Sequence, residues 1–406
     1  MLAHDRSVAI VGGGIGGLAA ALALLRAGFD VHVFEQAAAF KEVGAGIQIS
    51  PNASRLLHGF GLGEALDRAG VRPVAVHQRR WDDGRTLQRA PLGPEVAAAF
   101  GAPYYHFHRA DLLQALVDAL PPERLHTGHR LAGLGDRGDR VELTFEHGAR
   151  AVAGVLVGAD GIHSTVRAAL FGPEHPRFTG CIAYRGLVPA ERIAHLGVEV
   201  VSSNWMGPHG HFVHYFVAGG RLLNFVGVNE RDTWMRESWT DRGKVADALA
   251  AFDGWHPQVR EIIAAVDETY VWALFDREPL PRWTMGRVTL LGDACHAMLP
   301  FMAQGAAQAI EDGATLAACL SAAGPGDEPA ALLRYEALRR PRATRLQELS
   351  RVNKTRFHLP DGAAQRARDE EMATRGDRSI EAIAWLYAHD AGTVSVATVD
   401  SAGGSA

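Results

Sequence analysis

The 406-residue chain has little cysteine and almost no lysine. Its three cysteines stand far apart, without a C-x-x-C pair. This scarcity excludes a disulfide framework and a zinc site built on paired cysteines, and it favours a reducing, cytoplasmic location. Lysine occurs three times, so arginine carries nearly all of the positive charge. We interpret that bias as a matter of codon composition and not of function.

Strong charge and membrane signals are also missing. The formal net charge is −5, which gives no reason to expect nucleic acid or an anionic membrane as a partner. No basic segment precedes the first apolar run, and six glycines interrupt the stretch from Val8 to Phe29, so a signal peptide or membrane span is not expected. The nineteen histidines lack H-x-x-x-H and H-E-x-x-H spacing. We therefore expect no bound metal.

A strand, a glycine turn and a helix open the chain. The apolar run from Ser7 to Val11 predicts a strand, and the alanine- and leucine-rich run from Leu18 to Gly28 predicts a helix. Val31 to Phe34 then predicts a second strand that ends at Glu35. This succession is typical of one half of a doubly wound α/β sheet.

The turn contains Gly12, Gly14 and Gly17, which satisfy G-x-G-x-x-G. In this pattern the first glycine permits a tight turn, the second lets the backbone approach a pyrophosphate, and the third lets helix and strand pack closely. The helix N-terminus attracts phosphate through its free N–H groups. Glu35, eighteen residues after Gly17, places a carboxylate where a ribose diol can donate to it. The sequence therefore predicts an adenosine-diphosphate site for FAD or NAD.

Two stretches of alternating polarity predict β-rich segments. Val74 to Leu87 alternates about an Asp-Asp-Gly turn, and Gly210 to Val228 predicts a hairpin about Gly219-Gly220. On the first strand of that hairpin, period two places His211, Val213 and Tyr215 on one face. The opposite face takes Phe212, His214 and Phe216.

Two further motifs follow predicted buried strands. Val155 to Val157 leads into Asp160-Gly161-x-x-Ser164-x-x-Arg167, where Ser164 is expected to cap a helix. Arg287 to Leu291 leads into Gly292-Asp293-Ala294-x-His296, and a helix is expected from Ala306 to Leu320.

Arg109 and Gln48 are candidate ligand contacts. Arg109 begins a predicted helix, where a cation opposes the helix dipole, so a phosphate or a ribityl chain is expected to hold it. The alternative is an ordinary surface arginine. Gln48 follows Gly44 and Gly46, which suggest backbone passing close to something bulky. The alternative for Gln48 is a strand residue bonded to backbone.

The last quarter of the chain is predicted to be helical. Residues 331 to 353 are expected to form an arginine-rich helix pair that is interrupted near Pro341. The charged segment 361–378 is expected to be exposed, and a short amphipathic helix is expected over 380–389. From residue 391 onward we expect a mobile tail.

The three motifs, in this order, closely resemble those of the single-component FAD-dependent aromatic hydroxylases of the para-hydroxybenzoate hydroxylase fold. Within that group the chain is most similar to the salicylate, 3-hydroxybenzoate and 6-hydroxynicotinate hydroxylases. The resemblance covers nearly the whole chain, including Gly44 to Gln48, His108 to Leu112 and Trp385 to Tyr387.

The resemblance implies a doubly wound, Rossmann-like FAD-binding α/β domain with an inserted β-rich substrate domain and C-terminal helices. It predicts the FAD-binding domain over 1–73, 103–180 and 275–356. The substrate domain is predicted over 74–102 and 181–274, and a C-terminal helix and tail over 357–406. No separate nicotinamide domain is expected.

The resemblance further implies FAD as cofactor and NADH or NADPH as electron donor. Gly14 would hold the pyrophosphate, Glu35 the adenosine ribose, and Arg109 with Asp293 the ribityl–pyrophosphate side. Pro300 would lie beside the flavin. The implied cofactor contacts are Gly12, Gly14, Ile15, Gly17, Glu35, Gln36, Gln48, Arg109, Asp160, Asp293, Pro300, Gly305 and Ala306.

The implied activity is NAD(P)H- and O2-dependent hydroxylation of a phenolic acid of the salicylate or 3-hydroxybenzoate type, through a flavin C4a-hydroperoxide. A base at the phenol lowers the barrier, a contribution typically of about 10²–10⁴-fold. His211 and Tyr215 are the predicted catalytic residues, and the alternative is a histidine and a tyrosine packed in the core. The implied substrate contacts are Gln48, His211, Tyr215 and Pro300.

Other functions stay open at this point. The 6-hydroxynicotinate enzymes carry histidine where this chain has Gln48, and the 3-hydroxybenzoate enzymes carry glutamine where it has Pro300. A decarboxylating hydroxylase of 6-hydroxynicotinate or an aminohydroxybenzoate is one alternative. A non-oxygenating flavin reductase or a ligand-sensing flavoprotein is a more distant one. No arginine is identifiable as a carboxylate clamp, His296 is expected to cap a turn, and the chain is expected to be a monomer or homodimer.

Overall fold

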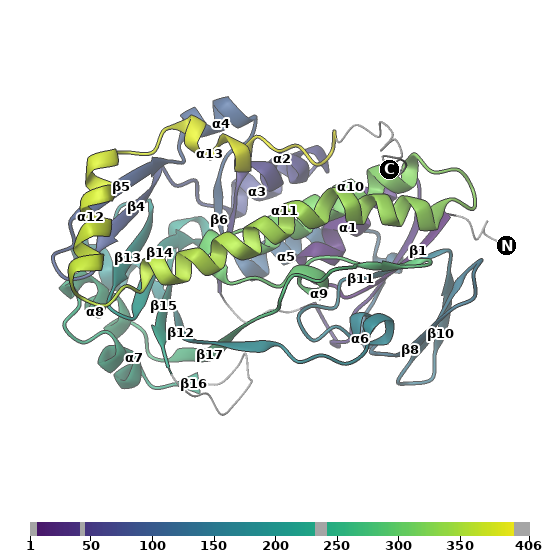
Figure 1. Ribbon diagram of the computed structural model, residues 1–406, viewed down its shortest axis with the longest axis horizontal. Helices are drawn as coiled ribbons and strands as arrows, with labels where there is room; N and C mark the ends of the chain where they lie inside the picture. The colour runs from purple at the N-terminus through teal and green to yellow at the C-terminus, as the bar shows by residue number, and fades with distance from the viewer. Residues whose placement is uncertain (1–5, 41–44, 232–241, 394–406) are drawn as a thin grey trace, which may run out of the picture.

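The computed structural model describes residues 6–40, 45–231 and 242–393, so the predicted mobile tail lies almost entirely outside the described residues. Two sheets stand at opposite ends of the molecule, and one long helix runs alongside both (Figure 1). Across the described ranges, we find no helix with the length and hydropathy that a bilayer span requires.

The first sheet has six strands and grows from the predicted strand-turn-helix. β1 (Ser7–Val11) lies between β2 (Asp30–Phe34) and β11 (Val155–Gly158) and is parallel to both, with Val8 opposite Val31 and Val155. The remaining strands are β7 (Leu125–His126), β18 (Thr284–Met285) and β19 (Val288–Leu290), giving the order β18-β19-β11-β1-β2-β7. The parallel strands confirm the predicted Rossmann-like α/β core.

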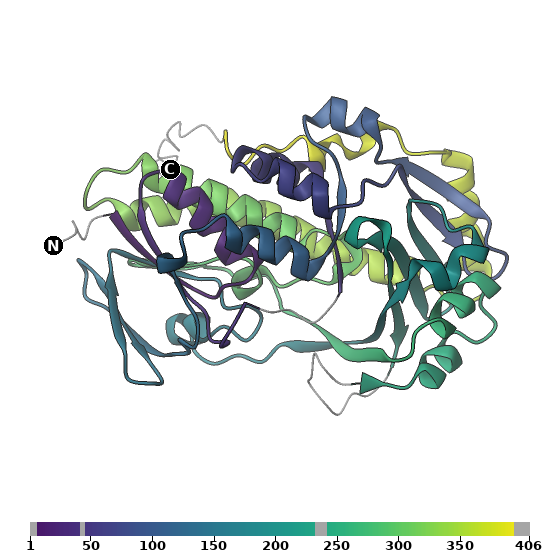
Figure 2. The same ribbon diagram turned by 180° about the vertical axis from the view of Figure 1, so that it is seen from behind.

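Helices cover one face of this sheet. α1 (Ile15–Arg26) packs between α10 (Gly305–Ser321) and α5 (Arg109–Asp118), and Figure 2 shows α1 and α5 side by side in purple and blue. A three-stranded antiparallel sheet packs into the same core: β8 (Leu131–Asp136), β9 (Val141–Phe145) and β10 (Arg150–Ala153).

The second sheet has eight strands in the order β16-β17-β12-β15-β14-β13-β4-β5. The predicted hairpins are present in it: β4 (Ala75–Arg80) with β5 (Thr86–Pro91), and β14 (Gly210–Val217) with β15 (Leu222–Glu230). Its other strands are β12 (Arg177–Pro189), β13 (Ser202–Gly207), β16 (Arg242–Gly243) and β17 (Thr269–Asp276). α7 (Val245–Ala251) and α8 (Pro257–Ala264) bury one face. The exact domain boundaries remain a prediction.

Shorter elements complete the described chain. β3 (Gly46–Ile49) and β6 (Tyr105–His108) pair as a two-stranded sheet. The remaining helices are α2 (Pro51–Gly59), α3 (Gly63–Ala69), α4 (Pro94–Phe100), α6 (Thr165–Phe171), α9 (Asp293–His296), α11 (Glu328–Phe357), α12 (Ala363–Arg375) and α13 (Ile380–Tyr387). Short 3₁₀ turns lie at 122–124, 190–196, 218–220 and 300–302.

The predicted interruption near Pro341 is wrong, because α11 continues through it from Glu328 to Phe357. Buried ion pairs anchor the turns on either side. Arg339 Nη1 donates to Glu311 Oε2 at 2.6 Å, and Arg342 Nε donates to the same oxygen at 2.8 Å. Both contacts bind α11 to α10, so tertiary pairing offsets the hydrogen bond that proline cannot make.

The prediction that segment 361–378 is exposed is also wrong in part, because one face of the helix that it forms, α12, is buried. α12 packs against β5, and its Arg368 and Asp369 are buried. Asp369 Oδ2 accepts from Arg80 Nη1 of β4 at 2.6 Å. A charged pair at the interface therefore ties the C-terminal region to the edge of the eight-stranded sheet.

Candidate active site

A cavity of about 780 Å³ lies between the two sheets. The glycine turn, β3 and the segment 291–309 line one side, and β12, β14, β15 and β17 line the other. This volume is in the upper part of the range for cofactor and ligand sites. Both halves of the fold therefore line the cavity. This arrangement suits a site in which a cofactor and a substrate bind next to each other.

The glycine turn has the shape of a phosphate cradle. Gly12 has a φ of +111°, and a Cβ there would lie 2.3 Å from the carbonyl oxygen of Ala159. A Cβ at Gly17 would lie 2.0 Å from the oxygen of Gly12. Nothing lies within 4 Å of a Cβ built at Gly14, which lines the cavity at the start of α1 without a side-chain cap. The first N–H groups of α1 thus suit a pyrophosphate.

Of the predicted site residues, ten line the cavity. They are Gly14, Ile15, Gln48, Arg109, His211, Tyr215, Asp293, Pro300, Gly305 and Ala306. Five predicted cofactor contacts do not line it. They are Gly12, Gly17, Glu35, Gln36 and Asp160. The two glycines shape the turn, and the roles of the other three as cofactor contacts remain predictions.

Glu35 and Asp160 bind local backbone. Glu35 Oε2 accepts from Gly13 N at 2.7 Å, which places this carboxylate beside the glycine turn. Asp160 Oδ2 accepts from Thr165 N at 2.7 Å, and its Oδ1 accepts from Ser164 Oγ at 2.5 Å. Burial raises the pKa of Asp160, and these hydrogen bonds act in the opposite direction. Asp160 therefore holds the start of α6.

A buried network positions the N-terminus of α10 beside the cavity. Asp312 Oδ2 accepts from Gly292 N at 3.0 Å and pairs with His296 Nε2 at 2.6 Å. Burial raises the pKa of Asp312, but the charges of His296 and Arg339 bring it down to about 2. His296 thus ties its segment to α10 instead of only capping the turn after Asp293.

β14 presents the predicted catalytic face to the cavity. His211, Val213 and Tyr215 line it, whereas Phe212 packs in the core on the other side of the sheet. His211 is buried, and its Nδ1 lies 2.7 Å from Nε2 of His358. Burial lowers the pKa of His211, with His358 acting in the same direction, so its imidazole is neutral near pH 7.

Tyr215 lies on the same face of β14 as His211. Gln48, on β3, lines the same cavity. Burial raises the pKa of Tyr215, so its phenol stays protonated. Gln48 Oε1 accepts from Tyr104 O–H at 2.7 Å. A Cβ at Gly46 would lie 2.5 Å from Cγ of Asn224 and 2.7 Å from Cε2 of Tyr215, so the backbone here approaches both of these side chains closely.

A family model described as an FAD binding domain matches residues 5–350. The chain belongs to this family. Its sequence is 44% identical to that of the 3-amino-4-hydroxybenzoate 2-monooxygenase of Streptomyces platensis, over 96% of this chain and 98% of the relative. It is 40% identical to the 6-hydroxynicotinate 3-monooxygenase of Pseudomonas fluorescens, over 87% of this chain and 92% of the relative.

A solved structure of Klebsiella pneumoniae HpxO, complexed with FAD and uric acid, superposes on this FAD-binding protein with a TM-score of 0.83 at 28% identity. It covers 94% of this chain and 96% of that one. Salicylate and 3-hydroxybenzoate hydroxylases also match over most of their lengths. These similarities confirm the predicted family, the fold and the FAD cofactor. The chain is an FAD-dependent monooxygenase of the aromatic hydroxylase type.

Sequence reasoning missed one charged residue in the cavity of this flavoprotein. Arg185 of β12 lines the cavity, and its guanidinium carbon lies 3.7 Å from the ring centroid of Trp272. Its Nε is buried without a hydrogen-bond partner, and no carboxylate pairs with it within the described ranges. Burial lowers the pKa of Arg185 to about 9. The signal in the sequence is an arginine flanked within β12 by the apolar runs Cys181–Tyr184 and Leu187–Val188.

Proposed function

We propose that this protein hydroxylates the ring of a phenolic aromatic acid, with NADH or NADPH as electron donor and O2 as co-substrate. One observation carries the proposal. A single cavity holds a neutral imidazole at His211, a phenol at Tyr215 and an unneutralised guanidinium at Arg185. These groups match the hydroxyl and the carboxylate of a phenolic acid.

Arg185 is proposed to bind the carboxylate. A buried guanidinium without a counter-ion is unfavourable, and an incoming carboxylate satisfies it with charge-assisted hydrogen bonds. The Trp272 ring holds the guanidinium plane and limits its rotation. Apolar cavity residues, among them Val213 and Val226, provide surface for the aromatic ring.

His211 is proposed to take the phenolic proton. Nδ1 is engaged by His358, so Nε2 is the ring nitrogen left for a substrate in the cavity that His211 lines. A neutral imidazole accepts a proton, and an electron-rich phenolate ring is the better target for an electrophilic oxygen. Tyr215, which stays protonated, orients the phenolic oxygen as a hydrogen-bond donor.

The glycine turn at Gly14, together with Arg109 and Asp293, is proposed to hold FAD. Bound FAD, once reduced, supplies the two electrons that activate O2. The N-terminus of α10, at Gly305 and Ala306, directs its N–H groups at the same space. It stabilises negative charge there through its dipole. The two sheets enclose the ring and exclude water from it.

A panel of ring acids tests the proposal. The FAD-loaded protein is incubated with NADH or NADPH and with salicylate, 3-hydroxybenzoate, 6-hydroxynicotinate or 3-amino-4-hydroxybenzoate. We expect at least one acid to accelerate NAD(P)H oxidation and to yield a hydroxylated product in stoichiometric amount. The aminohydroxybenzoate is included because the relative with 44% identity carries that name. If no acid on the panel yields a product, the proposal is overturned.

A further inference from the structure

A line of hydrogen bonds leads from the cavity to the surface. His211 Nδ1 lies 2.7 Å from His358 Nε2, and His358 Nδ1 lies 3.3 Å from Glu230 Oε1. Glu230 Oε2 lies 3.1 Å from Nδ1 of His209. The two inner histidines are buried, whereas the side chains of Glu230 and His209 are 35% and 62% exposed.

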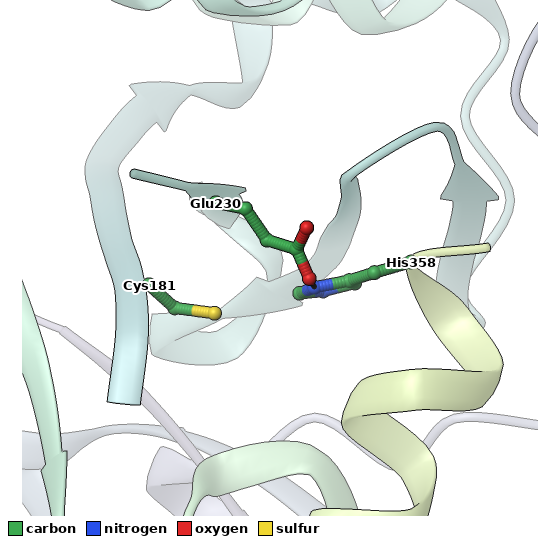
Figure 3. Close-up of side chains that lie close together, drawn as sticks. All are labelled: Cys181, Glu230 and His358. Carbon is green, nitrogen blue, oxygen red and sulfur yellow. Dashed lines mark hydrogen bonds and ion pairs between the residues drawn. The ribbon is translucent and has the colours of Figure 1, made fainter. Parts of the chain in front are cut away.

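Backbone contacts hold this line in place. His209 N donates to the carbonyl of His358 at 3.2 Å, and Glu230 N donates to the carbonyl of His209 at 2.8 Å. The end of α11 is thereby fastened to the β13–β14 turn and to β15. Figure 3 shows the Glu230 carboxylate directed at the His358 imidazole, with the Cys181 thiol to one side. The alignment thus rests on three elements far apart in the sequence.

We propose that His358 and Glu230 form a proton relay, which carries the phenolic proton from His211 to solvent beside His209. The relay rests on the proposed function, because it serves the proton that His211 accepts. His358 and Glu230 act through His211 and do not themselves touch the substrate.

The transfers balance along the line. The phenolic O–H bond breaks as an N–H bond forms at His211 Nε2, and the proton on His211 Nδ1 passes to His358 Nε2. The proton on His358 Nδ1 passes to Glu230, which gives it to water. The reverse transfer, which protonates the product before release, restores the starting tautomers. No electrons move in these steps.

The electrostatics suit such a relay. Burial lowers the pKa of His358, so both inner imidazoles are neutral and each offers one donor and one acceptor. The hydrogen bond from His358 and the nearby charges lower the pKa of Glu230 to about 2, so the carboxylate is ionised, accepts the hydrogen bond from His358 and passes a proton on to water instead of retaining it. The titratable groups that face the relay are His209, His211, Cys181 and Lys354. The other neighbours are the rings of Phe301 and Phe357.

A metal site is the competing interpretation, because ligand atoms of Cys181, Glu230 and His358 lie within 4.8 Å of one another. Two features oppose a cation there. The Lys354 ammonium acts on all three groups, and burial raises the pKa of the Cys181 thiol to about 11, which disfavours the thiolate that a metal needs. The hydrogen bonds already made by both His358 nitrogens favour the relay.

Proton release on substrate binding tests the relay. FAD-loaded protein is mixed with the phenolic acid in weak buffer, and a pH indicator and phenolate absorbance are followed by stopped flow. We expect His358→Gln and Glu230→Gln to slow proton release at least about tenfold near pH 7, within the range that positioned proton transfer contributes. The deficit should shrink at high pH and on addition of free imidazole, two readouts that a merely structural defect does not produce.

The controls separate the alternatives. Glu261→Gln removes a comparable surface carboxylate, since Glu261 Oε2 lies 3.0 Å from His195 Nε2, and we expect wild-type proton release. Cys181→Ser is likewise expected to release the proton normally, whereas loss in this variant would favour the metal site. Wild-type release in both His358→Gln and Glu230→Gln overturns the relay. Glu230 is partly exposed, so its variant tests the relay even if His358→Gln folds poorly. Failure of the wild type on the acid panel overturns the proposed function instead.

Discussion

At the scale of the residue, the cavity is defined by side chains whose pKa values are shifted by burial. Arg185 is the sharpest case, because its buried guanidinium has no carboxylate partner in the described part of the chain. Its Trp272 contact holds the charge but does not neutralise it. A negatively charged substrate group is therefore the missing partner.

We predict that Arg185→Met weakens binding of the aromatic acid by about 1.5–3 kcal/mol, the usual contribution of a hydrogen bond to a charged group. That free energy corresponds to a rise of roughly 10–150-fold in Kd. Titration of the FAD-loaded protein with the acid and with its uncharged carboxamide measures the difference. The carboxamide is the internal control and should bind both proteins alike. An equal loss for acid and carboxamide would assign Arg185 to structure alone.

His211 and Tyr215 support a second prediction at this scale. His211→Gln and Tyr215→Phe should bind FAD and accept electrons from NAD(P)H but release hydrogen peroxide in place of most product. Since burial lowers the pKa of His211, the wild-type coupling should persist below pH 6.5 and decline only as the imidazole becomes protonated. The defect of the variants should shrink at high pH, where the phenol ionises unaided. Product and peroxide yields across pH measure this, and full coupling in both variants near pH 7 would leave the pair as core packing.

At the scale of the element, the sequence predicted what local patterns determine. The strand-turn-helix at Gly12 to Gly17 and the Gly210–Val228 hairpin appear as expected, because glycine geometry and period two are local. The continuity of α11 was not predictable, since the ion pairs that support it come from Glu311 on another helix. For the same reason Arg185 and His358 were missed. Their importance lies in neighbours that only the tertiary fold supplies.

Pro341 allows a direct test of that account. If the ion pairs hold α11 together despite the proline, Pro341→Ala should restore a helix hydrogen bond and raise the free energy of unfolding by about 1–3 kcal/mol. The matched control is Pro329→Ala, which should change little because Pro329 lies in the first turn, where its missing N–H has no intrahelical partner. Thermal and urea unfolding of the three proteins measure the effect. A similar change at both positions would contradict the explanation.

At the scale of the whole molecule, the cavity lies where the two sheets meet, so a ligand there contacts both halves of the chain. α11 runs beside both sheets (Figure 1), and its C-terminal residues reach the relay at β14 and β15. Cofactor binding and global stability should therefore be coupled. Ligand binding stabilises a folded protein by RT ln(1 + [L]/Kd), which is about 2.7 kcal/mol at a hundredfold excess over Kd.

This coupling separates two carboxylates that the sequence placed in the FAD site. Asp293 is exposed at the cavity wall, so Asp293→Ala should leave the melting temperature of the FAD-free protein unchanged and reduce only the increase that added FAD produces. Glu35 accepts from the backbone of Gly13 and Ala37, so Glu35→Ala should lower the melting temperature without FAD as well. Thermal scans at several FAD concentrations give both quantities for each variant. An undiminished FAD-induced increase in Asp293→Ala would remove that residue from the cofactor site, whereas an unchanged FAD-free melting temperature in Glu35→Ala would show that its two backbone hydrogen bonds contribute nothing to the turn.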